Sequence, residues 1–340
     1  MPYDRLRRRL TESGSPTVTT LPDGSVDHFC TVAEDDAESP ETRDAFGREI
    51  LGDRSSFSFA VEATEPGGQA VNAAKQLHAL GGSVTCYGHL DAPVFESLPF
   101  DTVSMGAPAV VYVFGFSDRD VMFVEAADVA EWTLAEVRRV ADLPDVFGGD
   151  AVCCSNWDSV AGLESAFHRL SDADVPRIPF VFDPGDIVGC GPDEIGALLD
   201  AMAALQDAFD VVYSANRQEV RATAAPLSGP FDHDLARLAA IRAETGVTAA
   251  VMHARDEAAA AVTSDDRLRV SNYSVERPVR HTGGGDRFTG GLGHALACGW
   301  DWDVALACGN ACAVSYVESG STGGPNEVAA FLDERPPVDS

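Results

Sequence analysis

Lysine is almost absent from this sequence: Lys75 is the only one among 24 basic residues, against 54 acidic residues in a chain of 340. The resulting formal net charge of −30 repels phosphates and anionic membrane surfaces, which argues against nucleic acid and membrane partners. The acidic residues are scattered among apolar residues, which make up 45% of the chain, so we expect a folded core with a charged shell. Such a shell suits a cytoplasm of very high salt and indicates a halophilic source.

Long apolar runs and metal-binding spacings are also missing. No run of about eighteen apolar residues occurs, and no apolar segment follows the N-terminal arginines, so we expect a cytoplasmic protein without a spanning helix or signal peptide. The eight cysteines include no C-x-x-C pair, and the histidines show no zinc-site spacing. We therefore expect reduced thiols and no structural metal.

Two common nucleotide-binding motifs are absent. A P-loop needs a lysine after its last glycine, but Lys75 follows alanine. A dinucleotide fingerprint needs a third glycine where this chain has Phe288. Both ATP binding through a Walker motif and oxidoreductase chemistry are therefore poorly supported.

From about residue 130 the sequence alternates short apolar strands with helix-compatible segments. This order predicts right-handed βαβ units and a mostly parallel sheet covered by helices on both faces. Ligands collect at the carboxyl ends of the strands in such sheets. The predicted strands cover 150–156, 178–185, 210–216 and 248–254.

The first third of the chain is rich in β-forming residues and predicts a second, smaller sheet. Residues 17–34 have the pattern strand, turn, strand, and residues 108–126 that of a hairpin. A helix predicted over 67–82 lies between them and belongs to the main layer. We expect a loose start of about fifteen residues and one α/β domain over 17–335. A lid would be inserted in it as segments of about 28–65 and 103–128.

The segment "HTGGGDRFTGG" begins at His281 and places three glycines before Asp286. Glycines expose backbone N–H groups, and a following helix adds the positive end of its dipole, so Gly283, Gly284 and Gly285 predict an anion site. An aspartate fits there if it accepts a proton from an attacking hydroxyl. The alternative is a glycine-rich turn with a helix-capping aspartate.

Three elements in order resemble the PfkB (ribokinase-like) carbohydrate kinases. "GGQAVNAAKQLHALGG" resembles their N-terminal signature, and "TGGGDRFTGGLGHALACG" resembles their C-terminal signature. "SANRQE" contains the family's N-x-x-E spacing at a strand end. The resemblance implies a ribokinase-like α/β fold with a small β-sheet lid, and an ATP- and Mg²⁺-dependent kinase.

The same resemblance implies roles for single residues. Asp286 would be the general base, and the backbone of Gly283, Gly284 and Gly285 the anion hole. Asn216 and Glu219 would position Mg²⁺ and the nucleotide phosphates, mainly through water; their alternative is a strand-end turn and helix start.

Further positions match the acceptor and nucleotide sites of the family. Asp27 matches an aspartate that holds sugar hydroxyls, Gly67 and Gly68 match a di-glycine hinge, and Asn72 matches a polar contact to the acceptor. Thr282 and Asn310 would contribute to nucleotide binding, although core packing explains Asn310 equally well. Asp27 is otherwise a turn-capping residue.

Some positions depart from the family pattern. Arg280 stands where ribokinase-like members have an aspartate that helps to bind a monovalent cation, so activation by K⁺ through the usual ligands is doubtful. His253 and Arg255 lie in a segment that replaces a glycine-containing turn near the nucleotide phosphates. Arg255 is explained better as a solvated loop residue than as a phosphate ligand.

The sequence therefore predicts a carbohydrate kinase that acts on a sugar, sugar acid or nucleoside, and the resemblance admits a homodimer through the lid. It does not identify the acceptor, and ADP in place of ATP stays open as the donor. The alternative is a catalytically degenerate PfkB-like protein that binds a sugar or nucleotide in a regulatory role.

Overall fold

The computed structural model describes residues 1–12, 14–33, 40–52, 55–229, 231–262, 266–280 and 282–335. His281, together with residues 34–39 and 53–54 of the predicted lid segments, lies outside the described residues.

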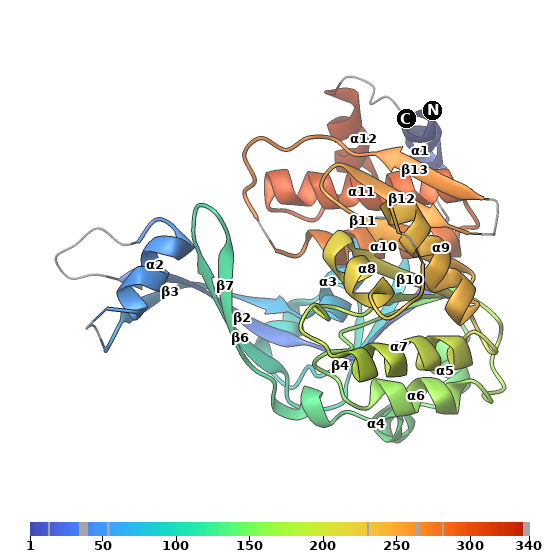
Figure 1. The fold of residues 1–340 in the computed structure, drawn as a ribbon, viewed down its shortest axis with the longest axis horizontal. Coiled ribbons are helices and arrows are strands. Elements are labelled where there is room, and N and C mark those ends of the chain that lie inside the picture. Colours follow the sequence, from blue (N-terminus) through green and yellow to red (C-terminus); the bar gives the residue numbers. More distant parts are fainter. Residues whose placement is uncertain are drawn as a thin grey trace.

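A nine-stranded sheet forms the centre of the described chain (Figure 1). Its strands are β1 (Thr17–Leu21), β4 (Ser83–Gly88), β5 (Asp101–Ser104), β8 (Ala151–Ser155), β9 (Pro179–Asp183), β10 (Asp210–Asn216), β11 (Ala249–His253), β12 (Glu257–Ala261) and β13 (Arg267–Ser271). They lie in the order β13-β12-β11-β10-β9-β8-β1-β4-β5. Only β12 pairs antiparallel with its neighbours β11 and β13. The mostly parallel sheet predicted from the alternating pattern is therefore confirmed.

Helices cover both faces of this sheet, as predicted. One face carries α1 (Pro2–Thr11), α3 (Gln69–Ala79), α10 (Gly284–Ala297), α11 (Trp302–Ser319) and α12 (Pro325–Asp333). The other carries α4 (Leu134–Val140), α5 (Leu143–Phe147), α6 (Leu163–Leu170), α7 (Pro192–Leu205), α8 (Arg217–Ala224) and α9 (Asp234–Thr245). Two single-turn helices, η1 (Pro93–Ser97) and η2 (Ala127–Glu131), complete the connections.

Alternation along the strands divides the core in two. Val152 and Phe180 point into one hydrophobic cluster, whereas Cys153 and Val181 point into the other. Because both strand faces are buried, the strands are continuous apolar runs, which is typical of parallel sheets.

The expectation of a loose N-terminal start is wrong. Residues 2–11 form α1, and its Tyr3, Leu6 and Leu10 are buried at helical spacing. The Tyr3 hydroxyl donates to the Ser271 carbonyl at 2.8 Å. Pro2 in the first turn has a backbone angle that suits a helix start, and the apolar face packs against α11 and α12.

A smaller sheet extends away from the helical body (Figure 1). It contains β2 (Ser25–Ala33), β3 (Ser58–Gly67), β6 (Ala109–Gly115) and β7 (Asp120–Glu125), in the order β3-β2-β6-β7. β6 and β7 form the predicted hairpin. A helix that was not predicted, α2 (Arg43–Ile50), packs Phe46 against this sheet. Val103 and Ser104, predicted for the lid, instead pair with β4 in the main sheet.

None of the described helices is long and apolar enough to cross a lipid bilayer.

Candidate active site

The predicted anion site lies at the N-terminus of α10. Gly283 is the residue before the helix and has a φ of 81°, a left-handed conformation that favours glycine. A Cβ on Gly284 would come within 3.0 Å of Val317, and one on Gly285 within 3.1 Å of His253. The N–H groups of a first helical turn have no acceptor within the helix, so they can bind an anion.

Asp286 lies in the same first turn and is partly buried. Its Oδ2 accepts a hydrogen bond of 2.9 Å from Asn72 Nδ2 on α3. Burial raises the pKa of Asp286 from 3.8 to about 7, although the Arg287 guanidinium lowers it. Such a carboxyl group is ready to exchange a proton near neutral pH.

Asp27 lies at the base of the small sheet and meets the predicted hinge. The Ser25 hydroxyl donates to Asp27 Oδ1 at 2.6 Å, and burial raises the pKa of Asp27. A Cβ on Gly67 would lie only 2.0 Å from Asp27 Oδ2, and one on Gly68 only 2.7 Å from the Gly24 Cα. Both glycines are therefore required by close contacts.

A second aspartate, Asp23, was not singled out from the sequence. It is 3% exposed, and its carboxylate accepts the backbone N–H groups of Gln69 at 2.9 Å and Ala70 at 2.8 Å. It therefore fixes the start of α3 and with it the position of Asn72. Its place at the carboxyl end of β1 is the signal that could have revealed it.

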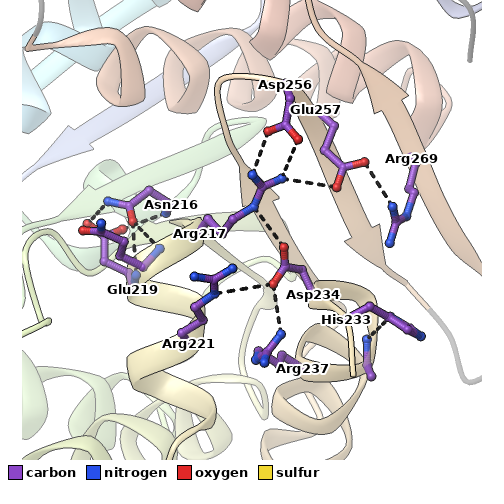
Figure 2. Close-up of polar contacts among 12 residues, drawn as sticks. Asn216, Arg217, Glu219, Arg221, His233, Asp234, Arg237, Asp256, Glu257 and Arg269 are labelled. Carbon is purple, nitrogen blue, oxygen red and sulfur yellow. Dashed lines mark hydrogen bonds and ion pairs between the residues drawn. The ribbon is translucent and has the colours of Figure 1, made fainter. Parts of the chain in front are cut away.

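Asn216 and Glu219 cap α8 in a reciprocal box (Figure 2). Asn216 Oδ1 accepts the Glu219 N–H at 3.1 Å, Glu219 Oε2 accepts the Asn216 N–H at 2.7 Å, and Asn216 Nδ2 donates to Glu219 Oε1. The alternative expected from the sequence, in which Asn216 and Glu219 form a strand-end turn and helix start, is therefore present. Burial is the main cause that raises the pKa of Glu219, and the nearby charge of Asp183 raises it further.

Next to this box, arginine and carboxylate side chains join three elements (Figure 2). Arg217 makes ion pairs with Asp234 at 2.9 Å, Asp256 at 2.8 Å and Glu257 at 3.4 Å. These contacts connect the starts of α8 and α9 with the turn after β11. They keep Asn216 in place at the end of β10.

Asp183 ends β9 and His253 ends β11, the two strands that flank β10. Asp183 accepts hydrogen bonds from Thr289 at 3.2 Å and from the Gly185 N–H at 3.1 Å. Burial lowers the pKa of His253 to about 4, so its ring is neutral where it packs beside Phe288 behind Gly285. Arg255, two residues further on, is exposed and donates to the Val275 carbonyl.

The remaining predicted nucleotide residues differ in their settings. Thr282 precedes Gly283 and is partly buried beside the anion site. Asn310 is 1% exposed and donates to the Val270 carbonyl and the Tyr3 hydroxyl. These are packing contacts, and a role of Asn310 near the nucleotide base stays a prediction.

Arg280 connects the loop before the anion site to the small sheet. Its Nη2 donates to Glu65 Oε1 at 2.9 Å, and its guanidinium lies 4.2 Å from the centre of the Phe29 ring. Lys75 donates to the Pro66 carbonyl nearby, and burial lowers its pKa to about 8. The acidic site is thus bordered by cationic groups from α3 and from this loop.

The donors present fit a hard cation held mainly through water. Across the described residues, no three His, Cys, Asp or Glu side chains form a group that could hold a metal ion by themselves. The carboxylates of Glu219 and Asp183 offer oxygen, which Mg²⁺ prefers. Their raised pKa values show two buried acids whose ionised forms a cation would stabilise.

Comparison with known proteins gives concordant matches. The family model described as prokaryotic ketohexokinase matches residues 34–335. A ketohexokinase from Haloferax volcanii is 31% identical over 297 residues, which cover 81% of this chain and 77% of that protein.

Solved structures match over nearly the whole chain. Ribokinase from Thermotoga maritima has a TM-score of 0.67 at 15% identity, covering 94% of this chain and 99% of its own. Arabidopsis thaliana ribokinase, complexed with ribose and ATP, has a TM-score of 0.66 at 16% identity, with the same coverage of 94% and 99%. The predicted ribokinase-like fold is confirmed.

We expect Asp286→Asn to stabilise the fold at neutral and alkaline pH. Because the pKa of Asp286 is raised from 3.8 to about 7 in the fold, its ionisation destabilises the folded state. This cost is absent below the unfolded pKa, grows as the pH rises and is complete above the folded pKa. The free energy of unfolding should rise by about 1–3 kcal/mol at alkaline pH, since one pKa unit corresponds to about 1.4 kcal/mol.

Thermal unfolding in molar KCl across the acidic to alkaline range measures this gain. Asp200→Asn, at an exposed aspartate on α7, is the control and should show no pH-dependent gain. Equal pH dependence of the wild type and Asp286→Asn would contradict the prediction.

Proposed function

Because the chain belongs to the prokaryotic ketohexokinase family, we propose that it transfers the γ-phosphoryl group of ATP to a hydroxyl of a ketohexose. The inferred PfkB kinship and the carbohydrate kinase class are confirmed by this membership. The Haloferax relative also supports the halophilic origin expected from the acidic composition.

The observation that carries the proposal is the position of Asp286 at the N-terminus of α10. Its carboxylate is held by Asn72 beside backbone N–H groups that can bind a phosphoryl group. Asp286 accepts the proton of the acceptor hydroxyl as that oxygen attacks the γ-phosphorus. The proton leaves the hydroxyl for the carboxylate, and the bond between the γ-phosphorus and the ADP oxygen breaks.

The backbone of Gly283, Gly284 and Gly285 faces the charge that develops on the phosphoryl oxygens. Donors fixed by the helix stabilise this charge without reorganising. Glu219 and Asn216 would hold Mg²⁺ through water, and the ion supplies charge neutralisation of the nucleotide phosphates when bound. The His253 ring behind Gly285 is neutral, so it adds no charge of its own to the anion site.

The acceptor would lie between Asp27 and Asn72. A carboxylate and an amide offer acceptors and donors that suit vicinal hydroxyls. Asp27 belongs to the small sheet, whereas Asn72 and Asp286 belong to the main body. Movement of the small sheet as a lid over the strand ends would therefore orient the acceptor and exclude water.

We expect ADP production from ATP in molar KCl with Mg²⁺ when D-fructose is supplied. Asp286→Asn should lower kcat by about a hundredfold to ten-thousandfold, the range of general base catalysis. Activity should rise with pH through about 7, the pKa of Asp286, because only the ionised carboxylate accepts a proton. A coupled assay with fructose, ribose, 2-keto-3-deoxygluconate and a nucleoside measures both the activity and the preferred acceptor.

Two outcomes separate the alternatives. Turnover with ADP but not with ATP would show that ADP, and not ATP, is the phosphoryl donor. Binding of sugar or nucleotide without phosphorylation of any acceptor would favour a degenerate regulatory protein and reject the kinase proposal.

We expect Gly67→Ala to weaken acceptor binding selectively. The new Cβ would lie 2.0 Å from Asp27 Oδ2, so the Asp27 side chain must leave its place. The KM for the sugar should rise at least about tenfold, the loss of one charged hydrogen bond, while the KM for ATP changes little. Gly196→Ala, with open space around a Cβ on α7, is the matched control; similar rises in both KM values for Gly67→Ala would contradict the assigned role of Asp27.

For the quaternary state, we propose a homodimer through the small sheet. β3 and β7 are its edge strands, and the side chains of Phe59, Val61 and Phe123 are about half exposed. Phe59 and Phe123 border an apolar groove of about 500 Å³ together with Phe46 and Phe114. A second copy offers the same apolar surface, and two-fold pairing would cover the groove of both copies.

Phe123→Asp should convert this dimer to a monomer. Light scattering after size exclusion in molar KCl measures the mass. Val188→Asp, at a residue 50% exposed on the main body, should leave the dimer intact. A monomeric wild type would reject the dimer.

A further inference from the structure

Arg287 is a buried guanidinium directly behind the anion site. It follows Asp286 in α10 and is 3% exposed. Its Nε donates to Thr322 Oγ1 at 3.0 Å, and its guanidinium lies 4.1 Å from the centre of the Tyr316 ring. Its Nη1 lies 3.5 Å from the position that a Cβ on Gly283 would take.

Arg287 interacts with the charge of Asp286 but makes no direct ion pair with a carboxylate among the described residues. The ion pairs among the described residues include partners for Arg217 and Arg280 but none for Arg287, and its Nη1 has no hydrogen-bond partner there. A buried cation without an anion in direct contact is costly. An anion bound at the N-terminus of α10 would supply that contact.

We propose that Arg287 is the fixed positive charge that holds a nucleotide phosphate over Gly283–Gly285 and keeps Asp286 ionised beside it. Arg287 is a positioning residue, because its guanidinium acts through the glycine backbone and through Asp286. The inference rests on the proposed kinase function and adds to it a residue that supports phosphate binding and the ionisation of Asp286.

Burial makes this charge effective in high salt. Ions screen exposed charges over a few ångströms at molar concentration, but they screen buried charges much less. The helix dipole contributes about half a charge at its N-terminus, and the full charge of the nearby guanidinium adds to its attraction for a phosphate.

The charges around Asp286 oppose one another. Burial raises its pKa, and Arg287 is the strongest of the groups that lower it. Removal of the guanidinium should therefore raise the pKa further. The titratable and polar groups that face Asp286 are Asp23, Asn72, Lys75, Asp183, Glu219 and Arg287.

Three variants test the proposal in molar KCl. Arg287→Met removes the charge at similar volume, Arg287→Lys keeps it, and Thr322→Val removes the hydrogen bond to Nε while the charge stays. The measurements are the pH profile of kcat/KM for fructose and the dissociation constant of β,γ-imido-ATP by calorimetry.

For Arg287→Met, the acid limb of the profile should move up by about one pH unit and analogue binding should weaken roughly tenfold or more. Arg287→Lys should retain most of both properties. Thr322→Val should keep the wild-type profile and affinity even if its melting temperature falls. If the methionine variant does not fold, Arg287→Gln replaces it as the neutral variant.

A neutral variant with the wild-type acid limb and wild-type analogue affinity would overturn the proposal. A similar loss in Thr322→Val would reduce Arg287 to a structural residue. If the wild type phosphorylates no acceptor, the kinase proposal fails, yet analogue binding still decides whether Arg287 supports the anion site.

Discussion

The candidate site depends on how closely α3 packs against α10. A Cβ on Gly290 would lie 2.7 Å from both the Ala73 carbonyl oxygen and the Gln76 Cβ, so the two helices are in backbone contact at this turn. Asn72 and Asp286 lie one turn nearer the helix starts, and the hydrogen bond of 2.9 Å between them follows from that approach. Because the start of α3 is in turn fixed by the buried Asp23, one rigid unit positions both the acceptor side and the base.

Several acidic side chains lie close together at this end of the sheet, and their burial lowers the stability of the fold. Asp23, Asp183 and Asp286 all have raised pKa values, with burial as the largest cause. Burial disfavours the ionised form of these carboxyl groups, so the ligand-free protein is less stable than it would be with neutral side chains at these positions. The same burial raises the pKa of Asp286 into the range that suits a general base. The burial that lowers the stability of the free protein is therefore the same burial that prepares Asp286 for proton transfer.

Local sequence patterns were sufficient to predict elements that are formed by contiguous residues. Alternating strands and helices indicated the main sheet, and the glycine-rich segment indicated the start of α10 with Asp286 in its first turn. The missed parts depend on long-range contacts. α1 is held by α11 and α12, and β12 and β13 extend the sheet antiparallel, which no local period requires. No local pattern distinguishes Asp23 from an ordinary turn residue, and none indicates that Arg287 is buried; the fold buries both side chains.

The placement of positive charge explains how a chain of net charge −30 can bind a phosphate. Beside the site, Arg217 is surrounded by Asp234, Asp256 and Glu257 (Figure 2), so it offers little attraction to a ligand. At the site, Arg287 is buried without a carboxylate partner among the described residues. Concentrated salt weakens steering by exposed charges but leaves a buried charge largely intact. In a chain almost without lysine, a buried cation at the site can therefore still attract a phosphate in concentrated salt.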